Sequence, residues 1–183
     1  MAKSRARTFP TRCAHCGCEI ESSTATLQDA SDDPSSCALC HLAQNLDCSE
    51  IDHEAVLIWA PEFTQGALNA LVHRVHSTFA AHGKSVSWPL DPLPPNCSEQ
   101  LLAAASAYAA LAERSVIAKA RIGTSSPRDL AEALSMISPG SYARRHELLG
   151  GARLLSLGRY FVDGRDIYPR LLVRERLASI LRR

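Results

Sequence analysis

The sequence predicts an α+β protein in which helices predominate, with a small cysteine-rich module followed by a helical domain. Three observations indicate this fold class: five of the seven cysteines lie between residues 13 and 40, one short apolar run has the character of a buried strand, and most of the remaining chain has helical periodicity. The 183 residues are 46% hydrophobic and 21% charged. That composition is typical of globular proteins, so we expect a folded chain rather than one disordered throughout.

The first regular elements that the sequence predicts are a strand and a helix. The apolar run Ala55–Trp59 has the length of a buried strand and is ended by Pro61. A helix is expected from Thr64 to about Ala81, with Gly83 at its end. The apolar stripe of this helix consists of Leu68, Leu71, Val72, Val75 and Phe79.

The second half of the chain predicts more helices. We expect one long alanine-rich helix from Ser98 to about Ala120, and a second helix capped by Ser126 with Pro127 at its first position. The buried stripe of the second helix is formed by Leu130, Leu134 and Ile137, before Pro139-Gly140 stops it. The elements expected after it are a short helix over 141–149, two short strands over 153–162 that turn at Gly158, and a basic amphipathic helix over 168–183.

These elements divide the chain into four segments. Residues 1–12 form a disordered basic start, residues 13–83 the cysteine-rich module with its strand and helix, residues 84–97 a linker with four prolines, and residues 98–183 the helical domain. The stretch from Cys13 to about Asp52 has few large apolar residues, so burial alone would not fold it. A bound metal is the usual source of the missing folding free energy.

The cysteine spacing indicates which metal. Cys13 and Cys16 form one Cys-x2-Cys pair, and Cys37 and Cys40 form a second, with twenty residues between the pairs. Two such pairs around one tetrahedral ion are typical of zinc ribbons and treble clefs. Gly17 follows the first pair and accepts the positive φ that such a turn often needs. The sequence therefore predicts one structural zinc per chain with these four cysteines as ligands.

Other residues near the pairs are alternative ligands. Cys18 is an alternative to Cys16, and His15 and His41 are further substitutes. A redox dithiol or buried free cysteines remain the readings without a metal. The isolated Cys48 and Cys97 are interpreted as small buried residues.

The sequence predicts no catalytic residues. Four thiolates leave zinc no open position for water, and we find no phosphate-binding glycine loop or nucleophile motif. A ββα-metal nuclease needs histidines between the two cysteine pairs, whereas residues 19–36 contain none.

The sequence disfavours two further metal sites. The first is an acidic loop with Asp29, Asp32 and Asp33, and the second a histidine site drawn from His53, His73, His76 and His82, in which His73 and His76 lie at the edge of the apolar helix face.

Charge is distributed unevenly along the chain. Residues 1–12 carry four basic groups and no acids, residues 13–143 carry six basic and fifteen acidic groups, and residues 144–183 carry ten arginines and four acids. This asymmetry favours a charged partner surface, or contact between the two ends and the acidic middle, over a uniformly basic nucleic-acid binder. Nucleic-acid binding through Arg5, Arg7, Arg12 and the later arginines is the second hypothesis.

The start of the chain is basic and has no apolar signal core, and no uninterrupted apolar run approaches the roughly 18 residues needed to cross a bilayer. We therefore expect a cytoplasmic protein without a transmembrane segment. The basic final helix is a candidate contact for an anionic membrane or an acidic partner.

Three segments resemble the IcmJ/DotN family of type IV secretion proteins, which belong to the coupling complex that recruits substrates to the transporter. They are CAHCG at the first cysteine pair, CALCHLAQNL at the second, and LIWAPEFTQGALNALVHRVH after it, and the resemblance covers roughly 65 residues from Cys13 to His76. It implies an HNH-like module whose metal site has become structural. The segment LQDASDDP stands where that family has a histidine-rich remnant, which strengthens the non-enzyme reading.

The resemblance implies a non-catalytic, zinc-stabilised adaptor that acts by protein–protein interaction in a type IV secretion or conjugation coupling complex. Its partners would be proteins of that complex, and through them it would lie at the inner face of the inner membrane. A zinc-ribbon regulator of DNA transfer is the alternative.

Overall fold

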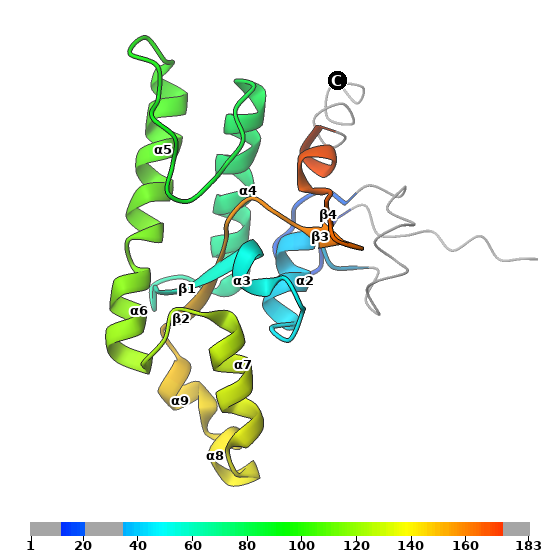
Figure 1. The fold of residues 1–183 in the computed structure, drawn as a ribbon, viewed down its shortest axis with the longest axis vertical. Helices are drawn as coiled ribbons and strands as arrows, with labels where there is room; N and C mark the ends of the chain where they lie inside the picture. The colour runs from blue at the N-terminus through cyan, green and yellow to red at the C-terminus, as the bar shows by residue number, and fades with distance from the viewer. Residues whose placement is uncertain (1–11, 21–34, 174–183) are drawn as a thin grey trace, which may run out of the picture.

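The computed structural model describes residues 12–20 and 35–173 and has a mostly helical α+β fold (Figure 1). Four cysteines cluster near the N-terminus, before the helical region, as the sequence predicted. The elements, labelled as in Figure 1, are α2 (Ala38–Gln44), α3 (Ile51–Glu54), β1 (Ala55–Trp59), α4 (Gln65–Ala81), α5 (Glu99–Ala112), α6 (Ser115–Ile122), α7 (Pro127–Met136), α8 (Pro139–Ala143), α9 (Arg145–Leu149), β2 (Ala152–Ser156), β3 (Phe161–Val162) and β4 (Arg165–Asp166).

A two-stranded antiparallel sheet lies at the centre of the fold. Strand β1, predicted as Ala55–Trp59, has those bounds and pairs with β2, so that Leu57 lies opposite Leu154. The two strands come from opposite sides of the proline-rich segment 84–97, and buried residues from both sides belong to one hydrophobic cluster. The predicted cysteine-rich module and helical domain are thus joined by strand pairing and by a shared core.

The second edge of β1 is covered by connections between helices. The Leu57 amide donates to the carbonyl of Ser125 at 2.9 Å, and the Trp59 amide donates to the carbonyl of Arg114 at 3.3 Å. These bonds occupy main-chain groups that an open edge strand would expose. Strand β1 is consequently hydrogen-bonded along both of its edges.

Helix α4 confirms the predicted helix and corrects the prediction for one of its residues. The Thr64 hydroxyl caps it by accepting from the Ala67 amide at 3.1 Å, and Gly83 follows its end with φ of 67°. His76 was expected at the edge of the apolar face but is fully buried. Its ring makes edge-to-face contacts with Tyr108 and Tyr168. These aromatic neighbours come from distant parts of the chain, and packing against them buries His76.

The single long helix expected over 98–120 is divided into α5 and α6. The break lies at Glu113-Arg114, where the amides of Arg114 and Val116 bond to carbonyls three residues back instead of four. The Arg114 carbonyl accepts both the Ala118 amide and the Trp59 amide of β1. Turning this carbonyl toward the strand gives a physical reason for the break.

One stretch differs from the expectation that no segment could cross a bilayer. Within the described ranges, Glu99–Met136 is long and apolar enough by length and composition to span a membrane. Core helices of soluble proteins meet the same criterion. Here α5 turns its apolar side, with Leu101, Tyr108 and Ala112, into the core, and the stretch is interrupted at Glu113 and at Gly123.

Helices α7, α8 and α9 form an arm at one end of the molecule (Figure 1). Ser126 and Pro127 begin α7 as predicted, and the Ser126 hydroxyl accepts from the Asp129 amide at 3.1 Å. Leu130 is buried and Leu134 half-buried, but Ile137 is exposed because α7 ends one residue before it. The short helix expected over 141–149 is instead two helices, and Pro139, expected as a breaker, begins α8.

The predicted pair of strands over 153–162 exists only in part. Strand β2 pairs with β1, whereas β3 pairs with β4, and the tight turn between β3 and β4 lies at Asp163-Gly164 instead of Gly158. Asp163 and Gly164 both have positive φ, at 50° and 71°, as a two-residue hairpin turn requires. A helical turn begins at Tyr168 as expected, and the remainder of the predicted helix beyond residue 173 lies outside the described residues, as does the basic start over 1–11.

The buried His76 makes stability depend on pH. Its Nδ1 lies 2.7 Å from the Tyr168 hydroxyl, Nε2 has no hydrogen-bond partner, and burial, followed by the charge of His73, lowers its pKa from 6.5 to about 3. The unfolded chain therefore binds this proton more readily than the folded one between those pH values. The contribution of His76 is complete above about pH 6.5 and is lost as the pH falls toward 3.

We predict that a His76→Leu variant loses this part of the pH dependence. As the pH falls below 6.5, the free energy of unfolding of the wild type should decrease more steeply than that of the variant, by up to about 1.4 kcal/mol per pH unit. Urea unfolding between pH 7.5 and 5.5 measures the slope. Tyr168→Phe is the control, since it removes a hydroxyl but keeps the imidazole buried, and it should retain the wild-type slope. Equal slopes for wild type and His76→Leu would contradict the prediction.

Candidate metal centre

The first cysteine pair lies in a tight reverse turn. The Gly17 amide donates to the Cys13 carbonyl at 2.9 Å, and the Cys13 amide donates to the Cys18 carbonyl at 2.8 Å. Gly17 has φ of 73°, the conformation expected for it from the sequence. Arg12 and Glu19 close the turn with an antiparallel bridge. The turn directs both thiols of the pair toward the same point.

The second cysteine pair lies at the start of a helix. Cys37 is the N-terminal cap of α2, and Cys40 is in its first turn. The Cys37 amide also donates to Sγ of Cys13 at 3.4 Å and so connects the two pairs. A helix N-terminus favours negative charge, so this position suits thiolates.

The structure brings the four predicted cysteines together. The Sγ atoms of Cys13, Cys16, Cys37 and Cys40 all lie within 4.8 Å of one another, and those of Cys16 and Cys37 are 3.5 Å apart. In a tetrahedral zinc site with Zn–S bonds of about 2.3 Å, the sulfur atoms are about 3.8 Å apart. Three of the four cysteines are buried and Cys16 is half-buried. The four side chains therefore fit one metal ion such as zinc.

The crowding of four thiols perturbs their ionisation. Hydrogen bonding with Cys37 lowers the pKa of Cys13 to about 5, while the bond with Cys13 raises the pKa of Cys37. In the same way, hydrogen bonding with Cys18 lowers the pKa of Cys16, and the bond with Cys16 raises the pKa of Cys40 to about 12. The thiols thus share their protons, and only a cation among them would let all four ionise together.

A buried amide contacts the cluster from α4. Asn69 is 2% exposed, and its Nδ2 donates to Sγ of Cys40 at 3.2 Å. Its Oδ1 accepts from Nε2 of Gln65 at 2.9 Å. Gln65 in turn bonds both main-chain groups of Leu154 in β2, at 2.8 and 2.9 Å. A continuous chain of hydrogen bonds therefore connects Cys40 to the central sheet.

Sequence reasoning missed Asn69. Its signal was its spacing, because Asn69, Val72 and His76 lie three and seven residues apart on the buried face of one helix. A polar residue in such a stripe needs a buried partner. The sequence does not show that this partner is a cysteine twenty-nine residues earlier.

The first turn of α4 touches the first cysteine turn at Gly66. A Cβ atom placed on Gly66 would lie 2.2 Å from the carbonyl oxygen of His15. Such an approach is possible only without a side chain. Gly66 therefore sets the distance between α4, which carries Asn69, and the turn that carries Cys13 and Cys16.

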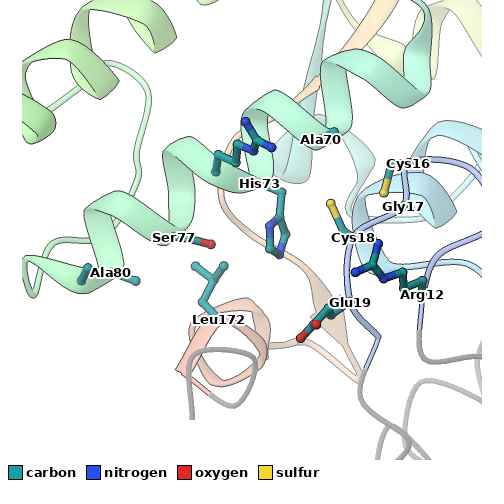
Figure 2. Close-up of a pocket in the computed structure, with 12 residues that line it drawn as sticks. Arg12, Cys16, Gly17, Cys18, Glu19, Ala70, His73, Ser77, Ala80 and Leu172 are labelled. Carbon is teal, nitrogen blue, oxygen red and sulfur yellow. The ribbon is translucent and has the colours of Figure 1, made fainter. Parts of the chain in front are cut away.

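The alternative ligands lie around the cluster, not inside it. Among the described residues, the cysteine, histidine and acidic side chains close enough to share an ion are the four cysteines above. Cys18 instead lines a cavity of about 430 Å³ between the first turn and α4, together with Glu19 and His73 (Figure 2). Nδ1 of His41 lies 3.1 Å from the amide nitrogen of Asn45, and the His15 carbonyl packs on Gly66.

The remaining candidates are dispersed. Cys48 and Cys97, expected to be buried, are half-buried against the core. His73 lines the cavity beside Cys18 while His76 is buried in the core, so the structure separates this pair. His82 contacts Thr78 and Ser98, and His53 is exposed on α3. Asp29, Asp32 and Asp33 lie outside the described residues.

The chain matches no model of a known protein family. A search of curated proteins likewise found no matching sequence.

We predict that Gly66→Ala destabilises the metal-loaded protein by about 1–3 kcal/mol, because the new methyl group would displace the His15 carbonyl. Helix propensity alone predicts the opposite sign, since Ala is favoured over Gly by about 1 kcal/mol in a helix. Urea unfolding measures the change. Gly140→Ala is the matched control, because that glycine also lies in the first turn of a helix and a Cβ there meets nothing within 4 Å. A stabilised Gly66→Ala variant would refute the close approach.

We also predict that Asn69→Leu lowers zinc affinity roughly 10–100-fold, the usual effect of losing a hydrogen bond to a ligand. Asn69→Asp should lower it at least as much, because a carboxylate cannot donate to Cys40 and adds negative charge beside it. Competition with a chromophoric chelator measures the affinity. The control is Asn45→Ala, which removes an amide that contacts His41 and no thiol. Unchanged affinity in Asn69→Leu would show that the amide does not support the site.

Proposed function

We propose that the protein is a non-catalytic adaptor, stabilised by one structural zinc and acting by protein–protein contact in a type IV secretion or conjugation coupling complex. The observation that carries the proposal is the cluster of four thiols, which would fill all positions of a tetrahedral ion and leave none for a substrate or an activated water. Zinc bound there supplies folding free energy to a segment that has little apolar surface to bury. Its chemistry is structural.

The location of the family-like segments supports the coupling-complex part of the proposal. The first forms the turn with Cys13 and Cys16, the second begins α2, and the third covers β1 and α4 up to His76. The first two segments carry the four cysteines, and α4 of the third contacts them through Gly66 and Asn69, so the resemblance follows neighbouring parts of the structure. The partners are proteins of the coupling complex, which would hold the adaptor at the cytoplasmic face of the inner membrane.

The exposed apolar surface supports an adaptor role. Large apolar side chains are exposed on the arm of α7, α8 and α9, where Met136 is 79% and Leu148 is 69% exposed. Apolar residues gathered on a projecting element are typical of contact surfaces for other proteins.

We predict that the purified chain carries one zinc and that Cys37→Ser loses it together with cooperative folding. A buried serine hydroxyl does not replace a thiolate, so a tetrahedral ion would lose one of its four ligands. Native mass spectrometry with elemental analysis measures the metal, and thermal unfolding measures the fold. Cys97→Ser is the matched control and should retain both. A folded wild-type chain without zinc would overturn the structural-metal part of the proposal.

The coupling-complex role is tested by crosslinking the tagged chain in its own cells and identifying the attached proteins. We expect components of a secretion or conjugation apparatus, enriched over the Cys37→Ser variant and retained after nuclease treatment. Attachment that disappears on nuclease treatment would favour the nucleic-acid alternative instead. DNA cleavage by the purified chain with magnesium or manganese would contradict the absence of catalysis.

A further inference from the structure

A cavity of about 330 Å³ lies at the base of the arm, between α7, α9 and β2. Its wall is chiefly leucine, and the leucines come from five parts of the chain. They are Leu46, Leu57, Leu130, Leu134, Leu149 and Leu154. Three of them are half-buried, so the cavity opens at the surface and does not close within the core.

The cavity has a basic rim. Arg145, His146 and Arg153 line it. Glu147 lies 4.0 Å from His146, and the guanidinium of Arg153 donates to the carbonyls of Phe63 and Ala152, so Arg145 is the cation best placed to meet a ligand. The guanidinium of Arg145 is held in place, since it lies 4.2 Å from the ring centre of Tyr142 and donates to the Tyr142 carbonyl at 3.0 Å. An occupant that complements this site carries negative charge at the rim and an apolar group inside.

The interior offers no polar group to a ligand. Gln65 is the uncharged polar residue of the lining, and its amide already bonds Asn69 and both main-chain groups of Leu154. A buried polar group of a ligand would therefore find no partner there and would lose its hydration. This restricts the inserted group to an aliphatic or aromatic side chain.

A neighbouring cavity lies on the side of the cysteine cluster. This second cavity, of about 480 Å³, shares Ala43 and Gln65 with the first and extends along Cys40, Thr64 and Gly66. We use "the groove" for the two cavities together. An elongated groove with one apolar pocket and a basic rim has the form of a peptide-binding surface, in which side-chain pockets give specificity.

We propose that the groove binds an acidic peptide segment of a partner protein, with one leucine-sized side chain in the leucine-lined cavity and a carboxylate at Arg145. Tyr142 and Leu148 lie beside the rim, 44% and 69% exposed, and extend its apolar contact. This inference rests on the proposed adaptor function and assigns the surface that carries it. Gln65 connects the floor of the groove to Cys40, so the metal centre and the binding surface share a support.

The test uses the zinc-loaded full chain and a fluorescent nine-residue peptide library with a central leucine flanked by glutamates or aspartates, measured by anisotropy. We expect saturable binding that weakens with salt, and no binding of the same library with lysine in place of the acids or serine in place of leucine. Arg145→Glu should weaken binding at least ten-fold. Arg144→Glu is the matched control: this neighbouring arginine is also exposed on the arm but does not line the cavity, so binding should be kept.

Equal binding to Arg145→Glu and wild type, or no binding of any library member by the folded, zinc-loaded chain, would overturn the groove proposal. So would rim-dependent binding of a simple amphiphile such as decanoate without any peptide binding, because the site would then serve small molecules. The two proposals fail separately. Crosslinking to coupling-complex proteins that Arg145→Glu leaves intact would reject the groove and keep the adaptor, whereas peptide binding without such crosslinks would keep the groove and reject the adaptor role.

Discussion

The side-chain amide of Gln65 joins three parts of the structure that the chain order keeps apart. It bonds both main-chain groups of Leu154, as a neighbouring strand would, and so extends the two-stranded sheet into the first turn of α4. It also fixes Asn69, whose Nδ2 donates to the sulfur of Cys40. Because an amide buried without partners is costly, this network stabilises one relative position of sheet, helix and cysteine cluster.

The network explains how a small metal module and a helical region form one structure. The four thiols cannot all ionise without a cation among them. A bound metal would therefore stabilise that segment, while β1 and α4, which follow it directly, are anchored in the common core by β2. A metal at the cluster would stabilise the sheet through Asn69 and Gln65. The close approach of Gly66 to the His15 carbonyl adds a direct packing contact between α4 and the cysteine turn.

Local sequence signals predicted the parts of the fold that depend on local physics. The Cys-x2-Cys spacing located the four thiols, Thr64 and Ser126 began the expected helices, and the apolar run Ala55–Trp59 formed a strand with those bounds. The errors arose where a distant partner decided the outcome. The helix over 98–120 broke where the Arg114 carbonyl serves Trp59, His76 was buried by Tyr108 and Tyr168, and β2 paired with a strand almost a hundred residues earlier. The hairpin at Asp163-Gly164 was a missed local signal, since Asp-Gly is a strong two-residue turn sequence.

The position of the metal centre limits where this protein can act. Cys13, Cys37 and Cys40 are buried, Cys16 is half-buried, and Asn69 of α4 bonds the sulfur of Cys40, so a partner would contact chiefly the residues around the cluster. The arm combines exposed apolar groups with the guanidinium of Arg145 at the rim beside it. An acidic ligand would be drawn to this rim at long range, whereas the leucine-lined interior would select by size at contact. Burial therefore separates two roles: the cysteine cluster supports the fold, and exposed side chains on the arm and the rim would bind the partner.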